Sequence, residues 1–117
     1  MINFNTKLCQ KLISNHRHYW MMIFLCLQYI KDCPPRIRKC STFAFLFYQD
    51  DMISKKAMWE SFGTVFHNFA DFDKFISQNT NDYNIVICKT KEKDIKKKYK
   101  KWKAKSNYNY QNNLITF

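Results

Sequence analysis

Lysine side chains crowd the C-terminal part of this sequence, where residues 89–105 hold ten Lys against Glu92 and Asp94. Ammonium groups neutralise phosphates and release counterions from nucleic acids, so this composition is typical of a segment that binds polyanions. The segment contains no Arg, the side chain that most often reads base edges, so we expect contacts to RNA or DNA phosphates without sequence specificity. Tyr108 and Tyr110 follow it, and tyrosine rings stack on unpaired bases.

A second, shorter basic cluster occupies residues 36–39. The residues that we expect to contact nucleic acid are Lys89, Lys91, Lys96, Lys97, Lys100, Lys101, Lys103, Lys105, Tyr108, Tyr110, Arg36, Arg38 and Lys39. The alternative is a solvated lysine-rich face without a partner, because Lys far outnumbers Arg and an A+T-rich coding sequence would favour Lys codons.

The cysteines and histidines offer weaker candidates for chemistry. The five cysteines form no C-x-x-C pair and no signal peptide is evident, so we expect free thiols in a reducing, intracellular compartment. His16 and His18 lie near Cys9, Cys33 and Cys40 in the sequence, but their spacing matches no familiar zinc site. We therefore expect neither a bound metal nor a cofactor.

Catalytic constellations are equally sparse. Cys88 and His67 fall on neighbouring expected strands and are the one candidate pair of nucleophile and base, without local support. Gly63 is the only glycine, which excludes glycine-rich loops that cradle nucleotide phosphates. The sequence therefore favours a non-enzymatic binding protein with no catalytic residues.

Length and charge distribution support a single small domain with an anionic partner. The chain has 117 residues and a net charge of +11. Residues 1–40 hold seven Lys and Arg against one Asp, whereas residues 41–88 hold six acids against three Lys. Basic segments thus flank an acidic middle, and nucleic acid, an acidic membrane surface or an acidic protein would suit them.

The densest apolar run, residues 19–30, has a role that the sequence leaves open. As a helix it would span about 18 Å, short of the roughly 30 Å hydrocarbon core of a bilayer. We expect a buried helix or strand, and the alternative is a segment that docks on a membrane surface or on a protein partner. Pro34 and Pro35 end this N-terminal segment, residues 1–32, and residues 33–41 are expected to form a linker.

A second region, residues 42–117, alternates strand and helix patterns. Ser54 and Asp71 are candidate N-caps and Gly63 a candidate helix end, while Ile95, Tyr99 and Trp102 would share one face of a helix. The expected elements are a buried strand at 42–48, a helix at 52–62, a strand at 64–69, a helix at 72–78, a strand at 83–88, a Lys-rich helix at 91–105 and a strand at 114–117.

This alternation predicts the fold class. Strands that alternate with helices favour parallel pairing, so we expect a small three-layer α/β sheet with an added N-terminal apolar helix. An α+β arrangement is the alternative, because the pattern at 64–69 is weak.

The same region resembles the response-regulator receiver domains of flavodoxin-like topology. In that family an acidic pair follows the first strand, and here Asp50 and Asp51 follow Phe45–Gln49. Residues 114–116 resemble the fourth strand, with Thr116 near its end. The resemblance implies a fold of parallel strands and a divalent cation held by Asp50 and Asp51.

The sequence departs from that family at the position of the phosphoacceptor. The family places an acceptor Asp at the end of the third strand, whereas residues 85–88 are followed by Lys89. Within residues 42–117 we expect no counterpart of the family's fifth strand or of the Lys after it. The resemblance therefore implies a degenerate signalling domain that cannot accept a phosphoryl group.

Overall fold

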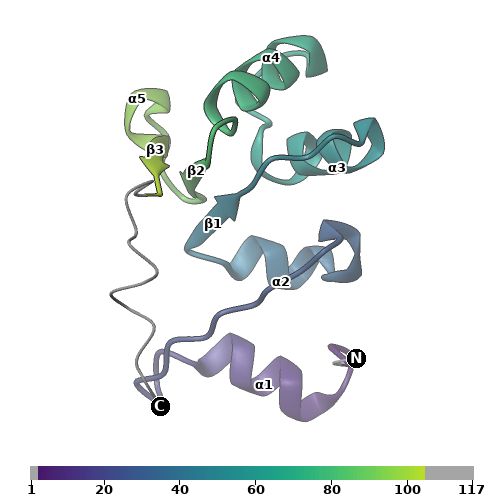
Figure 1. The fold of residues 1–117 in the computed structure, drawn as a ribbon. Coiled ribbons are helices and arrows are strands. Elements are labelled where there is room, and N and C mark those ends of the chain that lie inside the picture. The colour runs from purple at the N-terminus through teal and green to yellow at the C-terminus, as the bar shows by residue number, and fades with distance from the viewer. Residues whose placement is uncertain (1–2, 105–117) are drawn as a thin grey trace, which may run out of the picture.

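The computed structural model describes residues 3–104, which form a mixed domain of short helices and a three-stranded sheet (Figure 1). This confirms the expected mixture of helices and strands in a small fold. The elements are α1 (Lys7–Asn15), η1 (Ile30–Asp32), α2 (Pro35–Cys40), β1 (Phe43–Leu46), α3 (Met52–Phe62), α4 (Phe69–Asn79), β2 (Asn84–Lys89), α5 (Ile95–Lys98) and β3 (Tyr99–Lys103).

The sheet has the order β1-β2-β3, and both pairings are antiparallel. The expected parallel pairing was wrong. Two successive helices, α3 and α4, connect β1 to β2, so the chain returns to the end of the sheet from which it left. The expected strand at 64–69 was also wrong. Residues 64–68 turn between the two helices, and the Phe66 amide donates to the Gly63 carbonyl.

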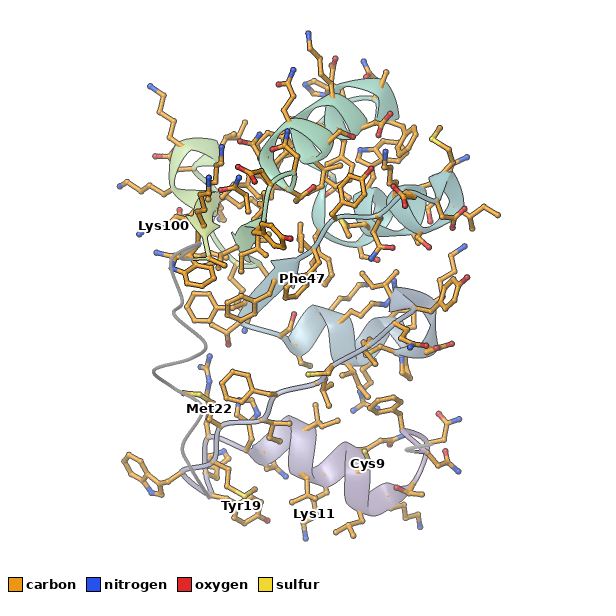
Figure 2. The ribbon with its side chains drawn as sticks, viewed as in Figure 1. Cys9, Lys11, Tyr19, Met22, Phe47 and Lys100 are labelled. Carbon is orange, nitrogen blue, oxygen red and sulfur yellow. The ribbon has the colours of Figure 1, made fainter. Side chains whose placement is uncertain are left out.

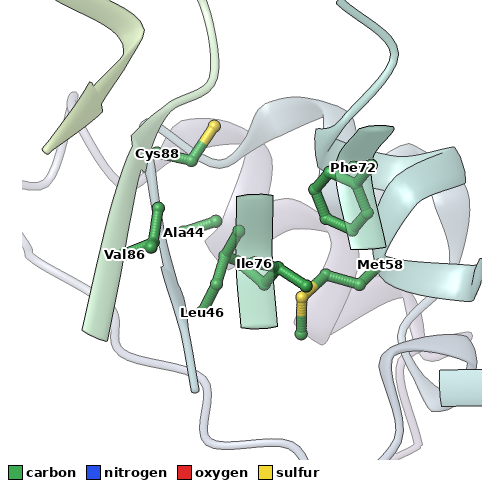
Figure 3. Close-up of a cluster of buried hydrophobic side chains, with 7 residues drawn as sticks. All are labelled: Ala44, Leu46, Met58, Phe72, Ile76, Val86 and Cys88. Atoms are coloured by element: carbon green, nitrogen blue, oxygen red, sulfur yellow. The ribbon is translucent and has the colours of Figure 1, made fainter. Parts of the chain in front are cut away.

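One face of the sheet packs against α3 and α4 (Figure 3). Alternate residues of β1 and β2 point into this core, as the period of two along a strand requires. The buried side chains of the cluster are Ala44, Leu46, Met58, Phe72, Ile76, Val86 and Cys88.

The ends of the two core helices follow ordinary capping chemistry. Helix α3 begins after Asp51, whose carboxylate accepts from the Ser54 amide at 2.9 Å, so the expected cap at Ser54 was three residues late. Helix α4 begins after Asn68, which caps the amide of Asp71 at 2.9 Å, so the expected cap at Asp71 was also three residues late. Gly63 ends α3 as expected, and its amide donates to the Trp59 carbonyl.

The expected Lys-rich helix at 91–105 was wrong. Helix α5 spans only Ile95–Lys98, and the chain continues as β3, which pairs with β2 from Asn84↔Lys103 to Cys88↔Tyr99. A longer helix would set like charges four residues apart along one face, and these repel. In the strand, Tyr99 instead packs against Phe75 and Phe66, with ring centroids 5.3 and 5.9 Å away.

The N-terminal region also differs from expectation. Residues 21–29 form no regular helix or strand, and their side chains are exposed, so the expected buried apolar helix or strand was wrong. Figure 2 shows Tyr19 and Met22 beside α1, far from α3 and α4. Residues 33–41, the expected linker, contain α2, which Pro35 starts favourably at its first position. The expected strand at 114–117 lies outside the described residues.

Among residues 3–104, no helix combines the length and the apolar character that crossing a bilayer requires.

Candidate nucleic-acid interface

The second face of the sheet carries aromatic and cationic side chains in rows. Strand pairing sets Phe43 opposite Lys89, and sets Phe45, Ile87 and Lys100 side by side across all three strands. Ile85 lies opposite Trp102 in the next row. We call this set the open face; it consists of Phe43, Phe45, Ile85, Ile87, Lys89, Lys100 and Trp102.

Exposure shows that the rings of the open face reach solvent. Phe43 is 51% exposed, Phe45 47% and Trp102 54%. The strand neighbours of Phe43 and Phe45, which are Ala44 and Leu46, are buried in the core, so the same period of two that builds the core presents the two Phe rings outward. Cross-strand neighbours lie about 5 Å apart, so a row of three covers roughly 10 Å.

The lysines of β3 divide between the two faces. Lys100 lies on the open face, whereas Lys101 and Lys103 alternate to the opposite side, in register with Val86 and Asn84. Lys103 forms an ion pair with Asp82 at 2.9 Å, and the Lys103 ammonium group lowers the pKa of that carboxyl. Lys103 is therefore partly neutralised.

The lysines before β3 lie on α5 and on the loop that precedes it. Lys96 and Lys97 are exposed on α5, and Lys91 is exposed in the loop. Within residues 3–104, only Lys55 and Lys103 form ion pairs. The other lysines in this part of the chain form no ion pair, which suits contact with a polyanion.

The second predicted cluster lies on α2. Arg36 and Lys39 are exposed, and Arg38 is half-buried, with its Nη1 donating to the Ser61 hydroxyl at 2.5 Å. Arg38 and Lys39 line a hollow of about 410 Å³ together with Lys98 from α5. The structure thus places Arg38 and Lys39 beside Lys98 of α5, but not beside the open face. Lys105, Tyr108 and Tyr110 lie outside the described residues.

Sequence reasoning missed the aromatic part of the open face. Phe43 and Phe45 were expected to be buried, and Trp102 was expected to share a helix face with Tyr99. The alternation of Phe43, Ala44, Phe45 and Leu46 was the available signal, because small or aliphatic residues alternate there with aromatic ones.

The other candidate sites do not assemble in the structure. His67 is exposed in the turn before α4, on no strand beside Cys88, and burial raises the pKa of the Cys88 thiol, which makes that thiol a poorer nucleophile. The described part of the chain holds no cluster of three or more His, Cys, Asp or Glu side chains suited to a metal. Asp51 is occupied as the cap of α3, and hydrogen bonds from Ser54 lower its pKa. The resemblance to receiver domains stays a prediction.

Comparison with known proteins finds viral relatives. The chain is 29% identical over 91 residues to Uncharacterized protein 075L of Invertebrate iridescent virus 6, and the matched residues make up 78% of this chain and 35% of that protein. It is 29% identical over 75 residues to Uncharacterized protein 088R of Invertebrate iridescent virus 3, which covers 64% of this chain and 29% of that protein. The chain thus spans about a third of the length of these relatives. No family model and no solved structure matches it.

Proposed function

We propose that this chain is a non-enzymatic binding protein for single-stranded RNA or DNA, and that the open face is its contact surface. The observation that carries the proposal is the row of Phe45, Ile87 and Lys100, flanked by Trp102, on a solvent-facing side of the sheet. An aromatic ring supports an unpaired base, while an adjacent ammonium group neutralises the phosphate that follows it.

The chemistry of the open face favours single strands over duplexes. Bases in a duplex are stacked on each other and offer no face to Phe43, Phe45 or Trp102. Each base stacked on an aromatic side chain contributes about 1–3 kcal/mol, irrespective of its identity. Lysines rather than arginines lie beside the rings, so we expect affinity to depend on phosphate contacts and base stacking rather than on base sequence.

A titration at two salt concentrations tests the proposal. Fluorescence anisotropy of a labelled, mixed-sequence 12-nucleotide strand would be measured with the full chain in 50 and 200 mM salt. We expect affinity to fall steeply with salt, and the matching duplex to bind more weakly. Binding that is absent in 50 mM salt, or that is equal in both salts, would contradict the proposal.

Two neighbouring lysines on β3 provide a matched pair of variants. Lys100 lies on the open face and Lys101 on the opposite side, and both are exposed. Lys100→Ala should reduce the slope of log affinity against log salt by about 0.7, the value for one phosphate contact on a single strand. Lys101→Ala should leave the slope nearly unchanged. Equal losses in both variants would show that the open face is not the contact surface.

A second candidate function uses the apolar segment. Trp20 is 97% exposed, Met22 80% and Phe24 72%, and together with the nearby Arg17 they suit docking on an anionic membrane surface or on a protein partner. Flotation of the chain with vesicles of neutral and anionic lipid tests this function. Flotation that needs anionic lipid and is lost in Trp20→Ser would support it, and an unbound chain would exclude the membrane.

A further inference from the structure

A pocket separate from the open face lies between α2, the end of α3 and α5. Its volume is about 410 Å³, within the range of sites that hold small ligands. Cys88 forms part of its wall, and Cys88 points to the core side of β2, away from the face that carries Ile87 and Lys100. The lining residues are Pro35, Arg38, Lys39, Glu60, Ser61, Phe62, Thr64, Cys88, Thr90 and Lys98.

Positive charge dominates the lining of this pocket. Arg38, Lys39 and Lys98 contribute three cations, against the single carboxylate of Glu60. The Lys98 ammonium group is held in place by the carbonyl oxygens of Thr90 and Glu92, both at 3.2 Å. These two bonds use two of its three donors and leave its charge available.

Arg38 has hydrogen-bonding capacity that the described residues do not use. Its Nη1 donates to the Ser61 hydroxyl, but its Nε is buried and has no partner within residues 3–104. A buried donor without an acceptor costs free energy, and an oxyanion in the pocket would give the guanidinium group further acceptors. Guanidinium groups bind phosphate oxygens through two parallel hydrogen bonds.

We propose that this pocket binds a phosphate monoester, with Arg38, Lys39 and Lys98 around the phosphate and the remaining volume holding the attached organic group. A monoester carries nearly two negative charges, so it gains more from three cations than a carboxylate or a phosphodiester does. The hollow is larger than a phosphate ion alone needs, and its wall includes the apolar ring of Phe62 and the Cys88 side chain. Burial raises the pKa of the Cys88 thiol, so this wall stays neutral at physiological pH.

Isothermal titration calorimetry of the full chain tests the pocket, with adenosine monophosphate, inorganic phosphate and uncharged adenosine as probes. We expect adenosine monophosphate to bind, inorganic phosphate to compete with it, and adenosine to bind at least tenfold more weakly. An equal affinity for adenosine and its monophosphate, or no binding of the monophosphate, would overturn the proposal.

Two arginines on α2 provide matched variants. Arg38 lines the pocket and Arg36 does not. Arg38→Gln should weaken binding of adenosine monophosphate about tenfold, the loss of one charge-assisted hydrogen bond. Arg36→Gln removes the same charge from the same helix and should change affinity by less than twofold. Equal losses in both would show a diffuse charge effect and overturn the site.

Two exposed residues keep the test decisive if Arg38→Gln disturbs the contact with Ser61 and lowers the melting temperature. Lys39→Ala should weaken binding about threefold or more, while Glu60→Gln should tighten it, because the only carboxylate of the lining is neutralised. Opposite effects of these two variants would support the proposal, and effects of the same sign would contradict it.

The phosphate could belong to a free nucleotide or to the end of a nucleic acid, and a second comparison separates these sources. A 5′-phosphorylated oligonucleotide should bind more tightly than its 5′-hydroxyl counterpart, with the difference lost in Lys39→Ala, if the end of a strand is bound. Equal affinities would assign the pocket to free nucleotides. Lys100→Ala should leave binding of adenosine monophosphate unchanged. The proposed role of the open face and the proposed role of the pocket can therefore be contradicted independently of each other.

Discussion

Replacement of Gly63 by alanine tests how tightly the core packs behind the sheet. A Cβ atom at this position would lie 2.6 Å from both Cδ2 and Cε2 of Phe72, and 3.0 Å from Cδ1 of Trp59. Ordinary contact begins at 3.4 Å, so the Phe72 ring would have to retreat by about 0.8 Å. Phe72 is fully buried and packs edge-on against Phe66, with centroids 5.7 Å apart, so it has little room to move.

The expected loss follows from two opposing terms. Overpacking a core side chain costs about 1–3 kcal/mol. The φ of Gly63 is −115°, which alanine adopts without strain, and the less flexible unfolded chain recovers about 0.4–1 kcal/mol. We therefore expect Gly63→Ala to lower the free energy of unfolding by about 1–2 kcal/mol, which is a fall in Tm of roughly 4–8 °C for a domain of this size.

Urea unfolding followed by tryptophan fluorescence measures this loss, and a second substitution identifies its cause. Phe72→Leu removes the ring atoms that the new Cβ would meet. If the contact with Phe72 is responsible, Gly63→Ala should cost much less in the Phe72→Leu background than in the native chain. A neutral or stabilising effect of Gly63→Ala in the native chain would show that the core accommodates the extra methyl group without displacing Phe72.

Three further predictions concern single side chains. Trp102→Ala should weaken single-strand binding at least fivefold by anisotropy, through loss of one stacked base, while Trp102→Phe retains most of the affinity. Hydrogen bonds lower the pKa of Asp51, so its carboxylate stabilises the folded state above the ordinary carboxyl pKa, and this stability is lost as pH falls through the folded-state pKa. Asp51→Asn keeps a cap but removes the titrating group. In urea unfolding from pH 7 to 3, the free energy of unfolding should therefore fall less in this variant than in the native chain. The Lys55 side chain is 13% exposed and pairs with Asp73 at 2.9 Å, so Asp73→Ala should cost about 1–2 kcal/mol in urea unfolding and the exposed Lys56→Ala almost nothing.

Local signals in the sequence located the core helices and the central strand. The helix at 52–62 has the observed bounds, and the strand expected at 83–88 is displaced from β2 by one residue. A turn signal at Gly63 and β-branched residues in 85–87 act within a few positions along the chain, so the sequence alone reveals them.

Contacts between distant segments decided what the sequence could not show. Ile95, Tyr99 and Trp102 have helical spacing, yet pairing with β2 places Tyr99 in the core and Trp102 on the open face. Tertiary packing of Tyr99 against Phe75 outweighs the local helical preference of its neighbours. The open face depends on cross-strand register. Composition predicts its lysines and the alternation in residues 43–46 indicates Phe43 and Phe45, but no local pattern places Trp102 beside them.

The indole N–H signals of the three tryptophans provide the most direct test of the open face as a nucleic-acid contact surface. Trp102 lies on that face, Trp59 donates its indole N–H to the Phe66 carbonyl, and Trp20 lies in the apolar segment. Titration of the ¹⁵N-labelled chain with a single-stranded oligonucleotide should shift the Trp102 signal in proportion to saturation while Trp59 stays in place. A titration in which Trp20 alone moves, or in which no indole signal moves at saturation, would contradict the account.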